Sequence, residues 1–367
     1  MQKIKNIYVA ATRQNDGKTI TALGLLHALC EIYPKVGYIK PVGQQVKLIG
    51  EHEIDKDASL MNDVFQIGSQ LPDMSPIAIK RSFTRDFILK GDVEELKKKI
   101  IKAYNRASYN KDFIVIEGTG HAGVGSVFDL SNADVAKLLG AKVILVTCGG
   151  IGRPIDEVML NKAVFDSYGI DLLGVIVNKI IPEKYKTIDK YVRLGFQRKG
   201  IDVLGVVPYC SVLSSPTIRQ LLEDIKGELI SGEERLDMSV SKIIVGAMPA
   251  HTALDYFTGD VLLITPGNRE DLILAAIACN SEEMKNYNVR GVILTCGVWP
   301  NKAILKLIKG TSIPVIMVKD DTFTTAQKIT NLIIKVRAED EEKIKKIKEL
   351  IKRYVDIDLI IKKIKAP

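Results

Sequence analysis

The stretch from Ala11 to Thr19 constrains the fold of this chain more than any other feature. It follows the apolar run Ile7–Ala10, which predicts a strand, and it precedes Ile20–Tyr33, whose apolar spacing predicts a helix. A strand, a short turn and a helix together point backbone N–H groups and the positive end of the helix dipole at one spot. Because polyphosphates bind at such spots, the sequence predicts a phosphate-binding loop on an α/β fold of the P-loop NTPase type.

The loop ends in Gly-Lys-Thr, the part of the motif that carries its chemistry. Lys18 is expected to meet the β- and γ-phosphates of a nucleotide, and the Thr19 hydroxyl is expected to reach a Mg²⁺ ion. Thr12 stands where such loops usually have their first glycine. The alternative is an ordinary strand-to-helix turn, but the position between a predicted strand and a predicted helix favours nucleotide binding. The expected binding loop consists of Thr12, Arg13, Gln14, Asn15, Asp16, Gly17, Lys18 and Thr19.

Composition limits the remaining possibilities. With 367 residues, of which 46 % are hydrophobic, the chain can bury two cores. No apolar run reaches the roughly 18 residues of a membrane helix, and the N-terminus leads directly into the first predicted strand, so we expect a cytoplasmic protein without a membrane partner. The five cysteines form no Cys-X-X-Cys pair and the four histidines show no metal spacing, so zinc is not expected.

The formal net charge of +8 raises the possibility of nucleic-acid binding. The lysine-rich segments 94–102 and 341–353, however, carry glutamates at helical spacing, which is typical of solvated amphipathic helices. We therefore expect no nucleic-acid partner.

Apolar runs alternate with helix-length segments along the whole chain. This alternation predicts a mostly parallel sheet with helices on both faces, followed by a smaller α/β domain and a C-terminal helix. Residues 213–236 are expected to form a linker helix and loop between a first domain over 1–212 and a second over 237–335, with a helical tail over 336–367. The expected strands are 7–10, 36–40, 113–117, 142–147, 172–178 and 203–208, then 242–248, 261–265, 291–295 and 313–318.

Two charged residues end predicted strands of the first domain, and Asp57 is a weaker third candidate. Parallel strands collect their chemistry at their carboxyl ends, so Lys40 and Glu117 should lie at the same sheet edge as the phosphate loop. Lys40, which precedes a proline, could also be a solvated turn residue. A carboxylate at the end of a buried strand is costly unless it is paired or bound to a metal, and Mg²⁺ near Lys18 would satisfy Glu117.

These motifs together carry a resemblance to a known family. Gly17-Lys18-Thr19, Lys40-Pro41-Val42, Asp57-Ala58, Glu117-Gly118-Thr119-Gly120, Val177-Asn178 and Gly205-Val206-Val207-Pro208 follow one another in the order seen in dethiobiotin synthetase. The later runs 263–271, 291–297 and 313–318 resemble the DRTGG domain. Both parts together resemble the N-terminal regulatory half of long bacterial phosphotransacetylases.

The resemblance implies a role for each matching residue. The backbone from Arg13 to Thr19 would hold the ATP phosphates together with Lys18, and Lys40 would neutralise charge on a transferred group, which makes Lys18, Lys40 and Glu117 the catalytic candidates. Mg²⁺ would be held by Thr19, Asp57 and Glu117. Asn178 and the segment around Pro208 would contact adenine.

The chain also departs from the family pattern. Gly43-Gln44-Gln45 replaces the serine-bearing turn of dethiobiotin synthetases, Ala11 stands at their first loop glycine, and Asn268 replaces the usual aspartate of the DRTGG loop.

Because residues 336–367 leave no room for a transferase domain, we expect no acetyl transfer. The expected function is a nucleotide-dependent regulator or slow ATPase, with an ATP-dependent ligase acting on a carboxylate or carbamate as the alternative. A binding module without chemistry is disfavoured by Lys18, Thr19 and Glu117. An unknown small-molecule effector or substrate and a homodimer are also expected.

Overall fold

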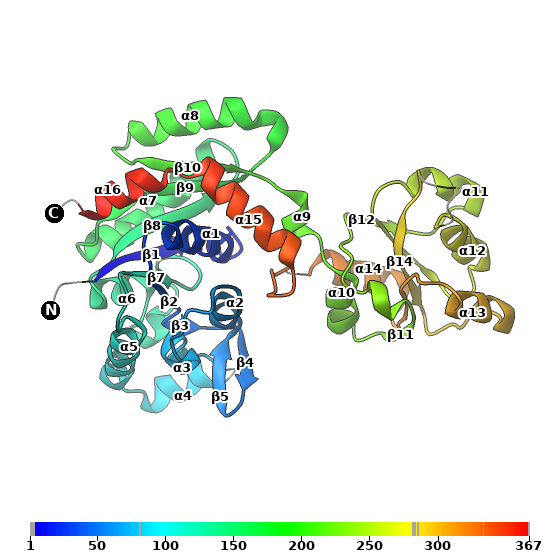
Figure 1. The fold of residues 1–367 in the computed structure, drawn as a ribbon, viewed down its shortest axis with the longest axis horizontal. Helices are drawn as coiled ribbons and strands as arrows, with labels where there is room; N and C mark the ends of the chain where they lie inside the picture. The colour runs from blue at the N-terminus through cyan, green and yellow to red at the C-terminus, as the bar shows by residue number, and fades with distance from the viewer. Residues whose placement is uncertain (1–3, 81, 281–283, 285, 333, 366–367) are drawn as a thin grey trace. The chain divides into compact units, whose positions relative to one another are not determined.

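The computed structural model describes residues 4–365 except 81, 281–283, 285 and 333. The chain divides into two compact units, which Figure 1 shows in their sequence colours. Unit 1 comprises Met1–Tyr209 and Arg337–Pro367, and unit 2 comprises Cys210–Val336. The chain therefore leaves unit 1, builds unit 2, and returns to unit 1.

A six-stranded parallel sheet forms the centre of unit 1. Its strand order is β10-β9-β8-β1-β7-β2, so β1, which leads into the phosphate loop, lies between β8 and β7. All five residues of β7 and the last six of β1 are buried, as strands covered on both faces require. The strands are β1 (Lys5–Ala11), β2 (Val36–Ile39), β7 (Phe113–Glu117), β8 (Lys142–Cys148), β9 (Leu172–Ile180) and β10 (Val203–Pro208).

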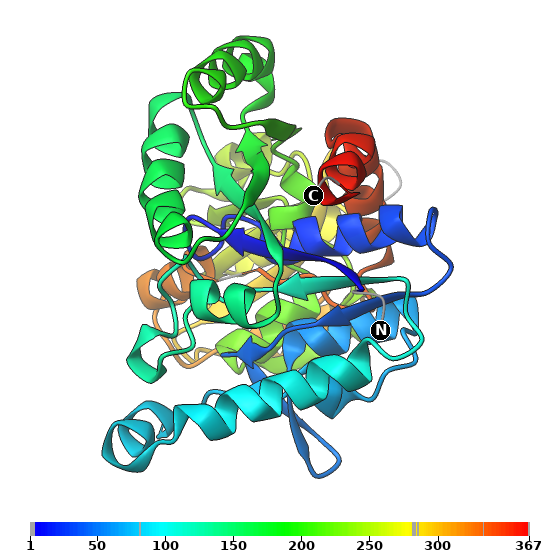
Figure 2. The same ribbon diagram turned by 90° about the vertical axis from the view of Figure 1, so that its left-hand side faces the viewer.

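Helices cover both faces of this sheet, as the sequence predicts (Figure 2). One face packs against α5 (Val93–Ala107), α6 (Asn132–Leu138), α7 (Gly152–Ser167) and α8 (Tyr185–Gln197). The other face carries α1 (Lys18–Cys30), α15 (Glu341–Tyr354) and α16 (Ile357–Lys365). The mostly parallel α/β architecture is confirmed.

The segment between β2 and β7 forms smaller elements that the sequence analysis did not predict. Two short sheets pair β3 with β6 and β4 with β5, and the second of these is an antiparallel hairpin that ends at Asp55. The elements are β3 (Val42–Gly43), β4 (Val46–Ile49), β5 (His52–Asp55), α2 (Lys56–Phe65), α3 (Leu71–Met74), β6 (Ile77–Ala78) and α4 (Phe83–Lys90).

The C-terminal segment consists of two helices instead of the single helix that its apolar stripe predicts. The break between α15 and α16 lies at the sheet, where Val355 forms a β-bridge with Gly205 and the Asp356 N–H donates to the Leu204 carbonyl at 2.8 Å. Gly24 of α1 faces Ile351 of α15 so closely that a Cβ at this glycine would lie 2.2 Å from the isoleucine Cγ1. The tail is thus an integral layer of unit 1.

Unit 2 contains a five-stranded sheet of order β11-β15-β14-β13-β12. Four strands are parallel, and β11 pairs antiparallel with β15. One face packs against α10 and α14, and the other against α11 to α13. The elements are α9 (Ser211–Ser214), α10 (Ile218–Ile225), β11 (Glu228–Ser231), β12 (Lys242–Val245), α11 (Ala250–Ala253), β13 (Val261–Pro266), α12 (Glu270–Ala278), β14 (Val289–Thr295), α13 (Lys302–Lys309), β15 (Val315–Met317) and α14 (Thr322–Thr330).

Residues 213–236, which we expected to link the domains, belong to unit 2 in this structure. The helix that the sequence predicts within 213–236 ends at Ile225, because Lys226 adopts a left-handed conformation with φ of 53°. The chain then turns and adds β11 to the sheet. The second, smaller α/β fold is confirmed.

Candidate functional site

The phosphate loop joins the carboxyl end of β1 to the first turn of α1. Gly17 precedes the helix with φ of 101°, a left-handed conformation that glycine adopts without strain. A Cβ at Gly17 would also lie 2.2 Å from the Asn178 side-chain nitrogen. Since no side chain caps α1, its first N–H groups remain available to an anion at this point.

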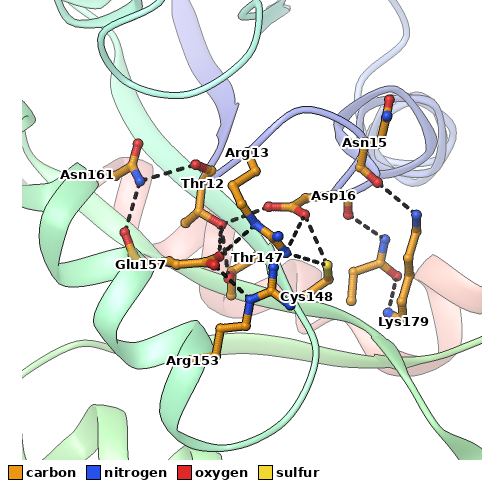
Figure 3. Close-up of polar contacts among 11 residues, drawn as sticks. Thr12, Arg13, Asn15, Asp16, Thr147, Cys148, Arg153, Glu157, Asn161 and Lys179 are labelled. Atoms are coloured by element: carbon orange, nitrogen blue, oxygen red, sulfur yellow. Dashed lines mark hydrogen bonds and ion pairs between the residues drawn. The ribbon is translucent and has the colours of Figure 1, made fainter.

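Side chains outside the loop bind three of its carbonyl oxygens (Figure 3). The Lys179 ammonium donates to the Asn15 carbonyl at 2.7 Å, and the Asn178 amide donates to the Asp16 carbonyl at 3.0 Å. The Asn161 amide donates to the Thr12 carbonyl at 3.3 Å. Three carbonyl oxygens of the loop are therefore held by side chains from outside it.

The side chains of the loop form a second network with β8 and α7 (Figure 3). Arg13 pairs with Glu157 at 3.0 Å and with Asp16 at 3.4 Å, while Thr12 donates to Asp16 at 2.8 Å. The Cys148 thiol donates to Asp16 at 3.0 Å. Asp16 is buried, so these partners compensate for a negative charge inside a loop expected to hold phosphate. Gln14 is exposed.

Lys18 occupies the first position of α1, and its side chain is half-buried. Burial lowers the pKa of Lys18, an effect that the charges of Glu117, Asp16 and Asp57 oppose. Within the described part of the chain, no carboxylate lies within ion-pair distance of its ammonium group. A partly buried cation without a direct counter-ion is unfavourable, and a polyphosphate is the kind of ligand that would supply the missing negative charge.

Lys40, in contrast, is surrounded by carboxylates. Its ammonium lies 3.0 Å from Asp55 and 3.9 Å from Glu117, and it donates a short hydrogen bond to Asp57. Burial alone would lower the pKa of Lys40, but the charges of Asp57, Glu117 and Asp55 raise it above its ordinary value. The structure therefore shows a buried charge cluster and not the solvated turn residue that we considered as an alternative.

Glu117 connects this cluster to the phosphate loop. Its carboxylate accepts hydrogen bonds from the Thr19 and Tyr38 hydroxyls, each at 2.8 Å. Burial raises the pKa of Glu117, and Lys40 opposes that shift. Glu117, Thr19 and Lys40 thus converge as the sequence predicts, at the edge where β1, β2 and β7 end.

The donor types around Glu117 fit a Mg²⁺ ion, which prefers hard oxygen ligands. Three buried carboxylates and one lysine carry a formal excess of negative charge, and the Thr19 hydroxyl already contacts Glu117. The carboxylates point at Lys40 in this structure, and no group of three His, Cys, Asp or Glu side chains among the described residues is arranged around a common metal position. The ammonium group of Lys40 supplies the positive charge that faces these carboxylates.

Sequence reasoning missed several residues at this site. Asp55 caps α2 by accepting from the Asp57 N–H at 2.9 Å, and an aspartate just before a helix is a recognisable capping signal. Tyr38 belongs to an apolar run, and Glu157, Asn161 and Cys148 have no local motif that distinguishes them. Asn178 contacts the phosphate loop at the Asp16 carbonyl. Pro208 is the last residue of β10, the strand that pairs with β9. The adenine contacts of both residues stay a prediction.

The described helices include none that is both long enough and apolar enough to span a bilayer.

Comparison with known proteins relates these features to two families. Residues 5–217 match AAA_26, a family described as an AAA domain, and residues 220–332 match the DRTGG domain. The phosphate acetyltransferase of Nitratidesulfovibrio vulgaris is 28 % identical over 362 residues, which cover 96 % of this chain and 50 % of that protein. The phosphate acetyltransferase of Synechocystis sp. is 25 % identical over 372 residues, which cover 98 % of this chain and 52 % of that protein. The chain spans about half the length of the curated relatives it matches.

Solved structures show weaker similarity. The MinC:MinD cell division protein complex of Aquifex aeolicus is 17 % identical, with a TM-score of 0.37, over 57 % of this chain and 84 % of that one. The CBS and DRTGG domains of the Clostridium perfringens pyrophosphatase regulatory region, complexed with diadenosine tetraphosphate, are 25 % identical with a TM-score of 0.26. That match covers 32 % of this chain and 46 % of that one. Neither likeness bears on function.

These relatives correct one prediction. We expected a regulator, slow ATPase or ligase without acetyltransferase activity, because residues 336–367 leave no room for a transferase domain. That prediction is wrong, since proteins that match 96 % and 98 % of this chain are named phosphate acetyltransferase. The arrangement of domains, in contrast, agrees with the resemblance. The chain belongs to the AAA_26 family and consists of a dethiobiotin-synthetase-like P-loop domain followed by a DRTGG domain.

Proposed function

We propose that this chain binds a nucleoside triphosphate with Mg²⁺ at the phosphate loop and that it serves phosphate acetyltransferase function. The observation that carries the nucleotide assignment is Lys18, a half-buried lysine without a carboxylate at ion-pair distance among the described residues. It lies at the uncapped start of α1, next to the left-handed Gly17. The β- and γ-phosphates of a nucleotide would compensate for both the lysine charge and the free N–H groups.

The residues that would hold Mg²⁺ are Thr19, Asp57 and Glu117. When bound, the ion would neutralise the oxygens of the terminal phosphates. Lys40 would hold the same carboxylates in place when no metal is bound, because its ammonium contacts both Asp57 and Glu117. Asn178 and Pro208 would face the adenine ring from the ends of β9 and β10.

Titration calorimetry with Mg-ATP tests this proposal. We expect saturable binding to the full chain that weakens when Mg²⁺ is chelated. Glu117→Gln keeps the shape of the side chain and removes its charge, so it should reduce the Mg²⁺ dependence more than the nucleotide affinity. Glu95→Gln, at an exposed position of α5, is the matched control. No binding of Mg-ATP by the parent chain would overturn the proposal.

The acetyltransferase part of the proposal rests on the names of the curated relatives that match nearly the whole chain. It is tested by following CoA thiol release from acetyl-CoA in the presence of phosphate, with and without ATP. We expect ATP to change the rate of this reaction. If no nucleotide changed the rate of CoA thiol release, nucleotide binding would have no role in acetyl transfer.

We also propose that the chain forms a homodimer. Edge strand β12 of unit 2 leaves Ile243 and Val245 exposed, by 38 % and 46 %, on a sheet with an open edge. Open strand edges favour pairing with another chain. Sedimentation velocity of the parent chain and of Val245→Lys, which places a charge on that edge, should show a dimer that the substitution weakens.

A further inference from the structure

We propose that Asn161 is a positioning residue that holds the phosphate loop and the glycine-rich loop after β7 at a fixed distance from each other. The proposal rests on the proposed nucleotide binding at the phosphate loop. The glycine-rich loop comprises residues 118–125 and begins directly after Glu117. Asn161 lies in neither loop but in α7, which follows β8.

The Asn161 side chain contacts both loops and its own helix. The Asn161 amide nitrogen donates to the Thr12 carbonyl of the phosphate loop at 3.3 Å and to the Glu157 carbonyl of its own helix at 2.9 Å. Its amide oxygen accepts from the Ala122 N–H of the glycine-rich loop at 2.9 Å. Figure 3 shows the two donor contacts. The side chain therefore bridges the loops that follow the neighbouring strands β1 and β7.

Helix stability gives no reason for an asparagine at this position. Asn161 lies in the interior of the 16-residue helix α7, where asparagine is less favourable than alanine. It is also 6 % exposed, and a buried amide costs free energy unless its donors and acceptor are satisfied. The two loops supply one carbonyl and one N–H for that purpose, so the position requires a side chain that donates and accepts at once.

The glycine-rich loop needs such an anchor because of its composition. Four of its eight residues are glycine, and two of these, Gly120 and Gly125, have positive φ angles. Glycine loses more conformational freedom on ordering than any other residue. Asn132 orders the start of the loop by accepting from the Thr119 N–H at 2.9 Å, and Asn161 fixes the next part at Ala122.

The bridge couples the conformation of the phosphate loop to that of the glycine-rich loop. Because Asn161 holds the Thr12 carbonyl, part of the cost of ordering the phosphate loop is met before a nucleotide arrives. Since the same amide holds Ala122, movement of one loop is transmitted to the other. Both loops lie at the carboxyl ends of adjacent parallel strands, where ligands of open α/β sheets bind.

Three variants separate this role from simple packing. Asn161→Leu keeps the number of side-chain heavy atoms and the branching at Cγ but removes every side-chain hydrogen bond. Asn161→Asp keeps an acceptor for the Ala122 N–H but has no donor for the Thr12 carbonyl. Leu160→Ala is the control, because this neighbour on the same helix is 72 % exposed. Each variant is first checked for the parent's circular dichroism spectrum and cooperative unfolding.

The first readout is hydrogen exchange without nucleotide. We expect faster exchange in residues 12–17 and 118–125 of Asn161→Leu, and faster exchange in residues 12–17 alone for Asn161→Asp. Leu160→Ala should match the parent. Parent-like exchange of both loops in a folded Asn161→Leu variant would overturn the proposal. This readout stays decisive even if the parent chain does not bind Mg-ATP, an outcome that would refute only the proposed function.

The second readout is the affinity for Mg-ATP. Loss of the bridge should weaken binding about tenfold in both Asn161 variants, because the binding free energy must then order the phosphate loop. A packing defect alone would lower the unfolding temperature without separating the exchange patterns of the Leu and Asp variants. Parent-like affinity in both variants would also contradict the proposal.

Discussion

The ammonium group of Lys40 lies 3.0 Å from a carboxylate oxygen of Asp55, the residue that caps helix α2. The same ammonium contacts Asp57 and Glu117, so one lysine is shared by three buried carboxylates that come from β5, α2 and β7. The charge balance of the candidate site therefore depends on Lys40 whenever no other cation is present.

We expect Lys40→Met to lower the free energy of unfolding by about 3 kcal/mol, because it removes the cation that contacts three buried carboxylates. Mg²⁺ should restore more of the stability in this variant than in the parent, since a ligand that binds the folded state stabilises it. Urea unfolding with and without Mg²⁺ measures both effects. Lys90→Met, on the exposed end of α4, is the control. An unchanged free energy of unfolding in Lys40→Met would contradict this account.

Lys18→Met should reduce the affinity for Mg-ATP at least about tenfold, or about 1.4 kcal/mol. The reason is the loss of a positive charge, at a half-buried position, that would face the terminal phosphates. The measurement is titration calorimetry on a variant whose circular dichroism matches that of the parent. Equal affinities would exclude Lys18 as a phosphate ligand.

The same variant should be more stable than the parent without nucleotide. Burial lowers the pKa of Lys18 in the folded state, so its stabilising contribution is present above the unfolded-state pKa and is lost as the pH falls through the folded-state pKa. At neutral pH the charged lysine therefore destabilises the ligand-free fold. Thermal unfolding at pH 7 should show a higher midpoint for Lys18→Met, and a lower midpoint would contradict the burial effect.

Cys148 should react slowly with iodoacetamide at pH 8. Burial raises the pKa of its thiol to about 11, and the hydrogen bond to Asp16 and the charge of that residue act in the same direction. The reaction rate should rise as the pH approaches 11, whereas the exposed Cys296 should be labelled readily at pH 8. Because the folded-state pKa of Cys148 is raised, the thiol's contribution to stability is present at neutral pH and is lost as the pH rises toward 11.

Asp16→Asn should shift the dependence of the labelling rate on pH to lower pH. If that dependence did not move, Asp16 would be excluded as a cause of the raised thiol pKa.

Gly24→Ala should destabilise unit 1 by about 1 to 3 kcal/mol, because the new Cβ would lie 2.2 Å from Cγ1 of Ile351. The higher helix propensity of alanine offsets part of this loss. Gly150→Ala is the control, since nothing lies within 4 Å of a Cβ at that position. Ile351→Ala in the same chain should make the effect of Gly24→Ala smaller, and additive effects would show that the two residues do not interact.

The parallel strands of the two main sheets could be predicted because parallel sheets require continuous apolar runs, which are visible in the sequence. The short strands β3 to β6 and the antiparallel strand β11 were not predicted. The convergence of Lys18, Thr19, Lys40 and Glu117 followed from the rule that parallel strands end at one edge. Asp55 and Asn161 could not be assigned in this way, since their roles depend on contacts with residues far away in the chain. The break between α15 and α16 was hidden for the same reason, because the pairing of Val355 with Gly205 is not encoded in the local apolar pattern.

The return of the chain to unit 1 has a consequence for biosynthesis. During synthesis, β1 to β10 emerge first, and about 130 further residues must be made before α15 can cover Gly24 of α1; at ribosomal speeds this takes on the order of ten seconds. For that time the helix that follows the phosphate loop keeps an apolar side uncovered on the nascent chain. Unit 2 is complete before unit 1 is, so the part that the ribosome starts first is the part that matures last.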